Sequence, residues 1–145
     1  MKIKIQIPDT KGLKRQEKVR ITDLNYGKHV GNQTYYEYAH DARCHLLYEM
    51  GATELDFFGT SLIMADSACQ YLGELKENDD FTITVHVGEI LKMGFELFYE
   101  IQSEVKSKDI ARIQTTLLCF DYETNKVTRL PEAAKHKLKA LKDQK

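Results

Sequence analysis

The chain has 145 residues, and its 22 acidic and 21 basic side chains nearly cancel to a net charge of -1. This length suits a single domain with its own core, so we expect one domain over residues 1–145. The charge balance, together with the lack of a basic stripe with interleaved aromatics, argues against a nucleic-acid surface. No apolar run approaches the length of a membrane span, so we expect no membrane partner.

The three cysteines, Cys44, Cys69 and Cys119, are odd in number and lie far apart in the sequence. Their spacing matches neither a disulfide framework nor a metal-binding motif. We therefore expect them to be small buried residues in a reducing cytosol, which predicts a cytoplasmic protein. We expect no metal and no cofactor.

The N-terminal part of the chain predicts two short strands. Residues 2–7 alternate between polar and apolar types and predict an edge strand, which the breaker sequence 8–12 ends. Residues 17–21 predict the next strand, with Val19 and Ile21 on one face.

The strongest helical pattern follows a polar, glycine-bearing turn. Thr34 and Glu37 fit a capping box, in which each side chain bonds a backbone N–H at the start of the helix. Gly51 is placed to end the helix as its C′ residue. Between these ends, apolar residues recur at helical spacing: Tyr35, Tyr38, Ala39, Ala42, Leu46 and Met50. A helix with so wide an apolar stripe is expected to be wrapped by other structure.

After this helix the apolar period changes from about four to two. Strands are predicted over residues 62–72, 81–87, 95–101 and 113–122, and their short connections favour antiparallel neighbours. Pro131 predicts the start of a C-terminal helix. One long helix against one antiparallel sheet is an α+β fold. Its open edges and face predict a homodimer or homotetramer.

The polar turn before the long helix is the first candidate site. It places Asp23, Asn25, His29 and Asn32 close to a helix N-terminus, where unpaired N–H groups and the helix dipole favour negative charge. A reaction that forms an oxyanion could use this arrangement. The alternative is an ordinary capped turn, in which these side chains only hold the loop.

Residues 23–35 read Asp-Leu-Asn-Tyr-Gly-Lys-His-Val-Gly-Asn-Gln-Thr-Tyr. The segment resembles the Asp-x-Asp-x-x-Gly-His-Val-x-Asn-x-x-Tyr motif of the hotdog-fold acyl-CoA thioesterases, typified by 4-hydroxybenzoyl-CoA thioesterase, although its glycine, Gly27, is displaced by one position. Arg43 and the segments 70–79 and 93–100 also resemble that family. The resemblance covers residues 18–122 and implies a hotdog fold, with one long central helix wrapped by a curved antiparallel sheet.

The resemblance implies hydrolysis of an acyl-CoA thioester whose carbonyl is polarised by backbone N–H at Asn32. Asp23, Asn25 and His29 would then position or activate the attacking water. The family's catalytic carboxylate is replaced here by Asn25, and a neutral amide cannot take a proton from water. The other carboxylates are Asp23, Glu37, Asp41 and Asp66. Which of them is the base stays open: Asp23 could act as base, and Glu37 or Asp66 is a further candidate.

The expected substrate-binding residues are Tyr35, Asp66, Met93 and Gly94, although core packing is the alternative for Tyr35. Asp66 lies within an apolar strand, where it would either face the active-site cleft or face solvent. Four basic residues are candidates for the CoA phosphates: Lys76, Lys92, Lys106 and Arg112. Two other functions stay open, which are binding of an acyl-CoA or acyl-carrier ligand without turnover, and a hotdog dehydratase.

Overall fold

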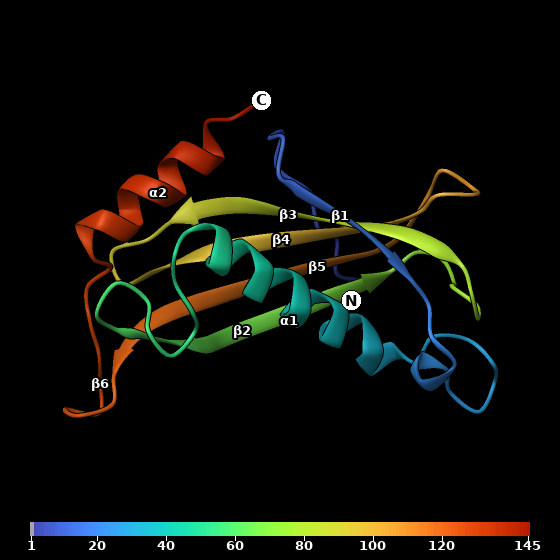
Figure 1. Ribbon diagram of the computed structural model, residues 1–145, viewed down its shortest axis with the longest axis horizontal. Helices are drawn as coiled ribbons and strands as arrows, with labels where there is room; N and C mark the ends of the chain where they lie inside the picture. The colour runs from blue at the N-terminus through green and yellow to red at the C-terminus, as the bar shows by residue number, and fades with distance from the viewer. Residues whose placement is uncertain (1) are drawn as a thin grey trace.

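The computed structural model describes residues 2–145 as two helices and one antiparallel sheet, in the strand order β1-β3-β4-β5-β2. Helix α1 lies across one face of this sheet, and α2 lies beside β3 at one end of it (Figure 1). The strands are β1 (Leu13–Lys18), β2 (Ser61–Tyr71), β3 (Asp80–Ile90), β4 (Gly94–Ser103), β5 (Lys108–Asp121) and the short β6 (Lys126–Val127), which pairs with β5. The helices are α1 (Asn32–Glu49), α2 (Glu132–Lys142) and the short 3₁₀ helix η1 (Ile21–Asp23).

The core lies between α1 and the sheet because both present their apolar residues to the same space. In β4 and β5 every second residue is fully buried, as the period of two predicts. Ala39, Ala42 and Leu46 of α1 belong to the same buried cluster as Leu97 and Ile113. The predicted α+β arrangement, with one long helix on an antiparallel sheet, is therefore confirmed.

The positions predicted for the two N-terminal strands are wrong. Residues 2–7 are not a strand: side chains hold this segment, because Ile5 donates its N–H to the Gln70 side chain and accepts from Arg112. The next strand is Leu13–Lys18, earlier than predicted. Its pairing continues only as far as Val19, after which the chain turns into η1, and Ile21 is exposed.

The start of α1 also differs from the prediction. The helix begins at Asn32 with Gly31 as its N-cap, so Thr34 lies inside the first turn and is not a cap. The Thr34 hydroxyl instead donates to the backbone carbonyl of Asp23, at 3.4 Å. The capping box with Glu37 is therefore absent, and Glu37 is exposed. The other end is as predicted, since Gly51 follows the C-cap with a φ of +78°.

The C-terminal helix is confirmed over Glu132–Lys142, with Pro131 as its N-cap. Ala134 and Leu138 are fully buried, and the helix packs against β3. Lys137 reaches back to donate to the carbonyl of Met50, which ties α2 to the end of α1. In the described part of the chain, neither helix combines the length and the hydropathy that a membrane crossing needs.

Candidate active site

Asp23 lies at the junction of β1, η1 and α1, and its side chain is already engaged. Its Oδ2 accepts from the backbone N–H of Arg20 at 2.9 Å and from the hydroxyl of Tyr38 at 2.7 Å. The residue is only 8% exposed. Its backbone carbonyl accepts from the N–H of Gly31 at 3.2 Å. Asp23 therefore fastens the turn to the first part of the helix.

Asn25 organises the loop that follows. Its side-chain oxygen accepts from the backbone N–H of Gly27 at 2.8 Å and of His29 at 3.4 Å. This is the Asx-turn geometry that the sequence left as the alternative role for such residues. Lys28 takes a left-handed conformation, with φ of 63°, which lets the loop close on the carbonyl of Asn25.

His29 sits at the side of this loop, against the segment that leads into β3. Its Nδ1 lies 3.3 Å from a carboxylate oxygen of Glu74. A backbone bridge between His29 and Lys76 joins the same two segments. The imidazole is half-buried, so part of the ring remains accessible to solvent.

The N-terminus of α1 presents free backbone donors. Thr34 donates its N–H to Gly31, but in the part of the chain that the structure describes, nothing accepts from the N–H groups of Asn32 and Gln33. The Asn32 carbonyl accepts from the hydroxyl of Tyr71 on β2, at 3.1 Å, which fixes this end of the helix to the sheet. An 18-residue helix thus offers two adjacent donors and its positive dipole end.

Glu37 lies one turn further on and is the carboxylate nearest to these donors along the helix. It follows Gln33 by four residues, and helical side chains lean toward the helix N-terminus, so its carboxylate lies over the turn that begins at Gln33. Its side chain is exposed and, among residues 2–145, makes no hydrogen bond or ion pair.

Two clefts flank α1, and Glu37 lines both. The first, of about 560 Å³, lies between α1 and strands β1 and β3 and is rich in charge. The second, of about 290 Å³, lies between α1 and strands β2 and β5. It is lined by Tyr36, Glu37, Ala39, His40, Arg43, Met64, Ser67 and Thr115. The second cleft has the more apolar lining of the two.

Three tyrosines pack behind the helix N-terminus. Tyr35, which is only 3% exposed, makes edge-to-face contacts with Tyr38 and Tyr71, with ring centroids 6.1 and 5.8 Å away. Burial raises the pKa of Tyr35 to about 12. Burial raises the pKa of Tyr38 as well, with a further contribution from the Asp23 carboxylate. The hydroxyls of Tyr38 and Tyr71 donate to the Asp23 carboxylate and to the Asn32 carbonyl, whereas Tyr35 packs in the core.

Asp66 does not line either cleft. A bulge at Ala65 inserts one extra residue into β2 between Met64 and Asp66. Met64 and Ser67 line the second cleft, whereas Asp66 lies between them on the opposite face of the strand, exposed to solvent. The bulge therefore reverses the facing that strict alternation would give.

Met93 and Gly94 lie at the far end of the sheet from the helix N-terminus. Tyr71, which contacts that terminus, pairs with Ala111, whereas Gly94 pairs with Leu118. The seven steps along β5 from residue 111 to 118 span about 24 Å. Within one copy of the chain, these two residues therefore do not join the candidate site.

A family model, the thioesterase-like superfamily, matches residues 19–138. The chain belongs to this superfamily. No curated protein matches it by sequence.

Solved structures similar to this thioesterase-like protein share its fold over most of the chain. A hypothetical protein from Staphylococcus aureus, solved in complex with CoA, has a TM-score of 0.85 at 16% identity, covering 98% of this chain and 90% of that one. A 1,4-dihydroxy-2-naphthoyl-CoA thioesterase from Synechocystis has a TM-score of 0.80 at 16% identity, covering 88% and 96%. A probable thioesterase from Escherichia coli has a TM-score of 0.73 at 24% identity, covering 88% and 97%. The predicted hotdog fold is thereby confirmed.

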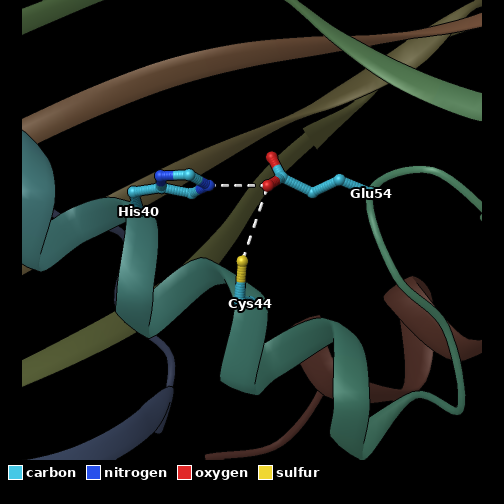
Figure 2. A group of neighbouring side chains, drawn as sticks. All are labelled: His40, Cys44 and Glu54. Atoms are coloured by element: carbon cyan, nitrogen blue, oxygen red, sulfur yellow. Dashed lines mark hydrogen bonds and ion pairs between the residues drawn. The ribbon is translucent and has the colours of Figure 1, made fainter.

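The structure of this superfamily member also contains a polar cluster that the sequence did not reveal. His40, Cys44 and Glu54 point toward one another where the loop after α1 returns alongside the helix (Figure 2). Arg43 donates to the same carboxylate, at 3.0 Å, and to the buried hydroxyl of Tyr99, at 3.1 Å. Only the spacing of His40 and Cys44, four residues apart, was visible in the sequence. Glu54 reaches them through the turn at residues 50–53.

The Cys44 thiol is not an activated nucleophile. Burial raises its pKa, and the neighbouring Glu54 carboxylate raises it further. A thiol with a raised pKa stays protonated at neutral pH, where only the thiolate is reactive. The cluster therefore gives no sign of cysteine-based catalysis.

Proposed function

We propose that the protein hydrolyses the thioester bond of an acyl-CoA, with the reacting carbonyl at the N-terminus of α1. The main observation is the pair of free backbone N–H groups at Asn32 and Gln33. One turn away lies the carboxylate of Glu37, which makes no hydrogen bond or ion pair within residues 2–145. Membership of the thioesterase-like superfamily supports this reaction class. So do the similar structures, one solved with CoA and one named as an acyl-CoA thioesterase.

In the proposed step, the thioester oxygen accepts from the N–H groups of Asn32 and Gln33. These donors stabilise the negative charge that grows on this oxygen as water attacks the carbonyl carbon. Glu37 takes the proton of the attacking water as general base. The tetrahedral intermediate then expels CoA as its thiolate, which receives that proton, so that acyl-CoA and water give a carboxylic acid and CoA thiol.

The other side chains of the turn act mainly by position. Asp23 and Asn25 hold the loop, through the bonds to Tyr38 and to the loop N–H groups. His29 keeps part of its imidazole exposed, and we assign it to orienting the water or contacting the thioester. This division of roles makes Glu37 the base in place of the carboxylate that Asn25 replaces.

We assign the acyl group to the cleft between α1 and β2, because Tyr36, Ala39 and Met64 give it an apolar lining. The CoA phosphates would lie at the other side of the helix N-terminus. Lys76 is the best-placed cation there, because its backbone bridge with His29 holds it beside the loop and its side chain is exposed. Arg112 is less suited, since it is bonded to Asp109 and to Ile5.

The predicted homodimer or homotetramer is retained as part of the proposal. β2 is the outer strand on the cleft side, and its free edge is the kind of surface that a second copy covers. Such a copy would close the cleft lined by Met64 and Ser67. Light scattering of the purified protein tests this, since a monomer at micromolar concentration would contradict it.

One observation favours a second candidate function, the binding of acyl-CoA without turnover. Asn25 stands where the family resemblance places the catalytic carboxylate, and its side chain is committed to the loop. Thiol release from a panel of short, long and aromatic acyl-CoAs separates the two functions. Turnover supports hydrolysis, whereas binding of the same ligands with no thiol release supports the binding function.

A further inference from the structure

A second group of side chains, separate from the helix N-terminus, carries the chemistry of a metal site. His40 and Cys44 are one helical turn apart, so they share one face of α1. Glu54 faces them from the loop between α1 and β2 (Figure 2). Its Oε1 lies 2.7 Å from Nε2 of His40 and 3.5 Å from Sγ of Cys44. One nitrogen, one sulfur and one oxygen atom all lie within 4.8 Å of one another.

The carboxylate of Glu54 is held in place by its other oxygen. Oε2 accepts from Nε of the buried Arg43 at 3.0 Å, which leaves Oε1 directed at the histidine and the cysteine. The backbone is fixed too, because Leu62 donates its N–H to the Glu54 carbonyl at 2.7 Å. A second residue that orients a ligating side chain is the usual support for a metal ligand.

We propose that His40, Cys44 and Glu54 bind one Zn²⁺ ion and that this ion fastens the loop after α1 to the helix. Imidazole, thiolate and carboxylate together are zinc ligands, whereas Mg²⁺ and Ca²⁺ select sites made of oxygen. Ligand atoms of a tetrahedral zinc site lie about 3–4 Å apart, so only small side-chain rotations are needed. The fourth position is open to water.

Solvent access fits this assignment. The side chain of His40 is 59% exposed and that of Glu54 is 30% exposed, so an ion can enter without unfolding the helix. On binding, the thiol of Cys44 loses its proton to solvent, and the His40–Glu54 hydrogen bond is replaced by two bonds to the metal. The ion takes no part in the proposed hydrolysis, although His40 also lines the cleft that we assign to the acyl group.

The test is a Zn²⁺ titration of the full-length, tag-free protein, stripped with EDTA and then exchanged into buffer with a phosphine reductant. Calorimetry should show one ion per chain, and the melting temperature should rise until that ratio is reached. Mg²⁺ should leave the melting temperature unchanged. In the Co²⁺-loaded protein, a thiolate-to-metal charge-transfer band should appear.

Two variants decide the outcome. His40→Gln changes an exposed position and should keep the fold, and Cys44→Ser should abolish the cobalt band. Loss of an outer partner costs about 10–100-fold in affinity, so loss of a direct ligand should cost at least about 100-fold. Matched controls are His136→Gln and Cys69→Ser, which should bind as the wild type does. The assignment is overturned if the wild type binds no stoichiometric Zn²⁺, or if both ligand variants bind it unchanged.

Discussion

The hydrogen bond that Tyr38 donates to Asp23 offers a test of the structural role of Asp23 in the turn. The hydroxyl donates to Oδ2 over 2.7 Å, and the carboxylate is 8% exposed. Tyr38→Phe removes the donor and nothing else. Because a hydrogen bond to a charged group contributes about 1.5–3 kcal/mol, we expect this variant to lower the free energy of unfolding by about 2 kcal/mol.

Asp23→Asn keeps an oxygen acceptor but removes the charge. Charge-assisted bonds are roughly twice as strong as neutral ones, so the expected loss is about 1–2 kcal/mol. Both variants weaken the same hydrogen bond. The double variant should therefore lose about 1 kcal/mol less unfolding free energy than the sum of the two single-variant losses. The chain has no tryptophan, so urea unfolding is followed by far-UV circular dichroism. Losses that add to within about 0.5 kcal/mol would refute the coupling.

The variants Asp23→Asn and Tyr38→Phe also distinguish a structural role of Asp23 from a catalytic one. If Asp23 only holds the turn, Asp23→Asn should keep thioesterase activity to within about tenfold, and Tyr38→Phe should do the same. Removal of a general base costs about 10²–10⁴-fold. A loss of that size in Asp23→Asn, with Tyr38→Phe active and both proteins folded, would move the base from Glu37 to Asp23.

Three further changes test other parts of the structure. Gly94→Ala should cost about 3 kcal/mol in urea unfolding, because a Cβ there would overlap the Leu117 carbonyl, and a wild-type midpoint would contradict the β4–β5 packing. Asn25→Asp should keep the hydrogen bonds of the loop and change kcat less than about tenfold. A rise in kcat of about 100-fold would show that a carboxylate at this position acts as the general base. Hydrogen bonds from Arg112 and Gln102 lower the pKa of Asp109 below its ordinary value near 3.8, so its contribution to stability is present above that pH and lost below it. Asp109→Asn should therefore be less stable than the wild type at pH 7, by a margin that shrinks as the pH falls below 3.8, and a margin that does not change with pH would exclude this linkage.

The sequence predicted the sheet and the long helix well because packing and local pattern agree there. Residues 81–87 alternate strictly, and they form part of β3 with the predicted apolar face buried; Thr84 and His86 on the other face are buried as well. The end of α1 was also predictable, since Gly51 takes the left-handed conformation that favours glycine. Where one face of an element is buried along its whole length, the residue period alone fixes its type.

Prediction failed where partners distant in sequence decide the structure. Residues 2–7 have a strand pattern, but Ile5 bonds a side chain of β2 and a side chain of β5 and pairs with no strand. Thr34 and Glu37 match a capping motif, yet the helix starts three residues earlier because the loop places Gly31, not Thr34, at its N-cap. The sequence left open whether Asp66 faces the cleft or solvent; the bulge at Ala65 turns it to solvent, and bulges leave no clear mark in a single sequence.

The candidate site was likewise predictable where local pattern decides it and not where partners distant in sequence do. The sequence located the turn and the helix N-terminus, and both lie together in the structure. It could not show that Asp23 and Asn25 are occupied by loop bonds, because Tyr38 is distant in the chain from the first and the loop conformation decides the second. That the Glu37 side chain has no partner is a property of the folded chain, which the sequence does not show.

The central claim is that Glu37 activates water at the α1 N-terminus, and steady-state hydrolysis of the best acyl-CoA substrate tests it most directly. Glu37→Gln should lower kcat by about 10²–10⁴-fold while substrate still binds, since only the proton acceptor is lost. Glu49→Gln, an exposed change at the other end of the same helix, should keep the wild-type rate. A Glu37→Gln enzyme with kcat within tenfold of wild type would contradict the account.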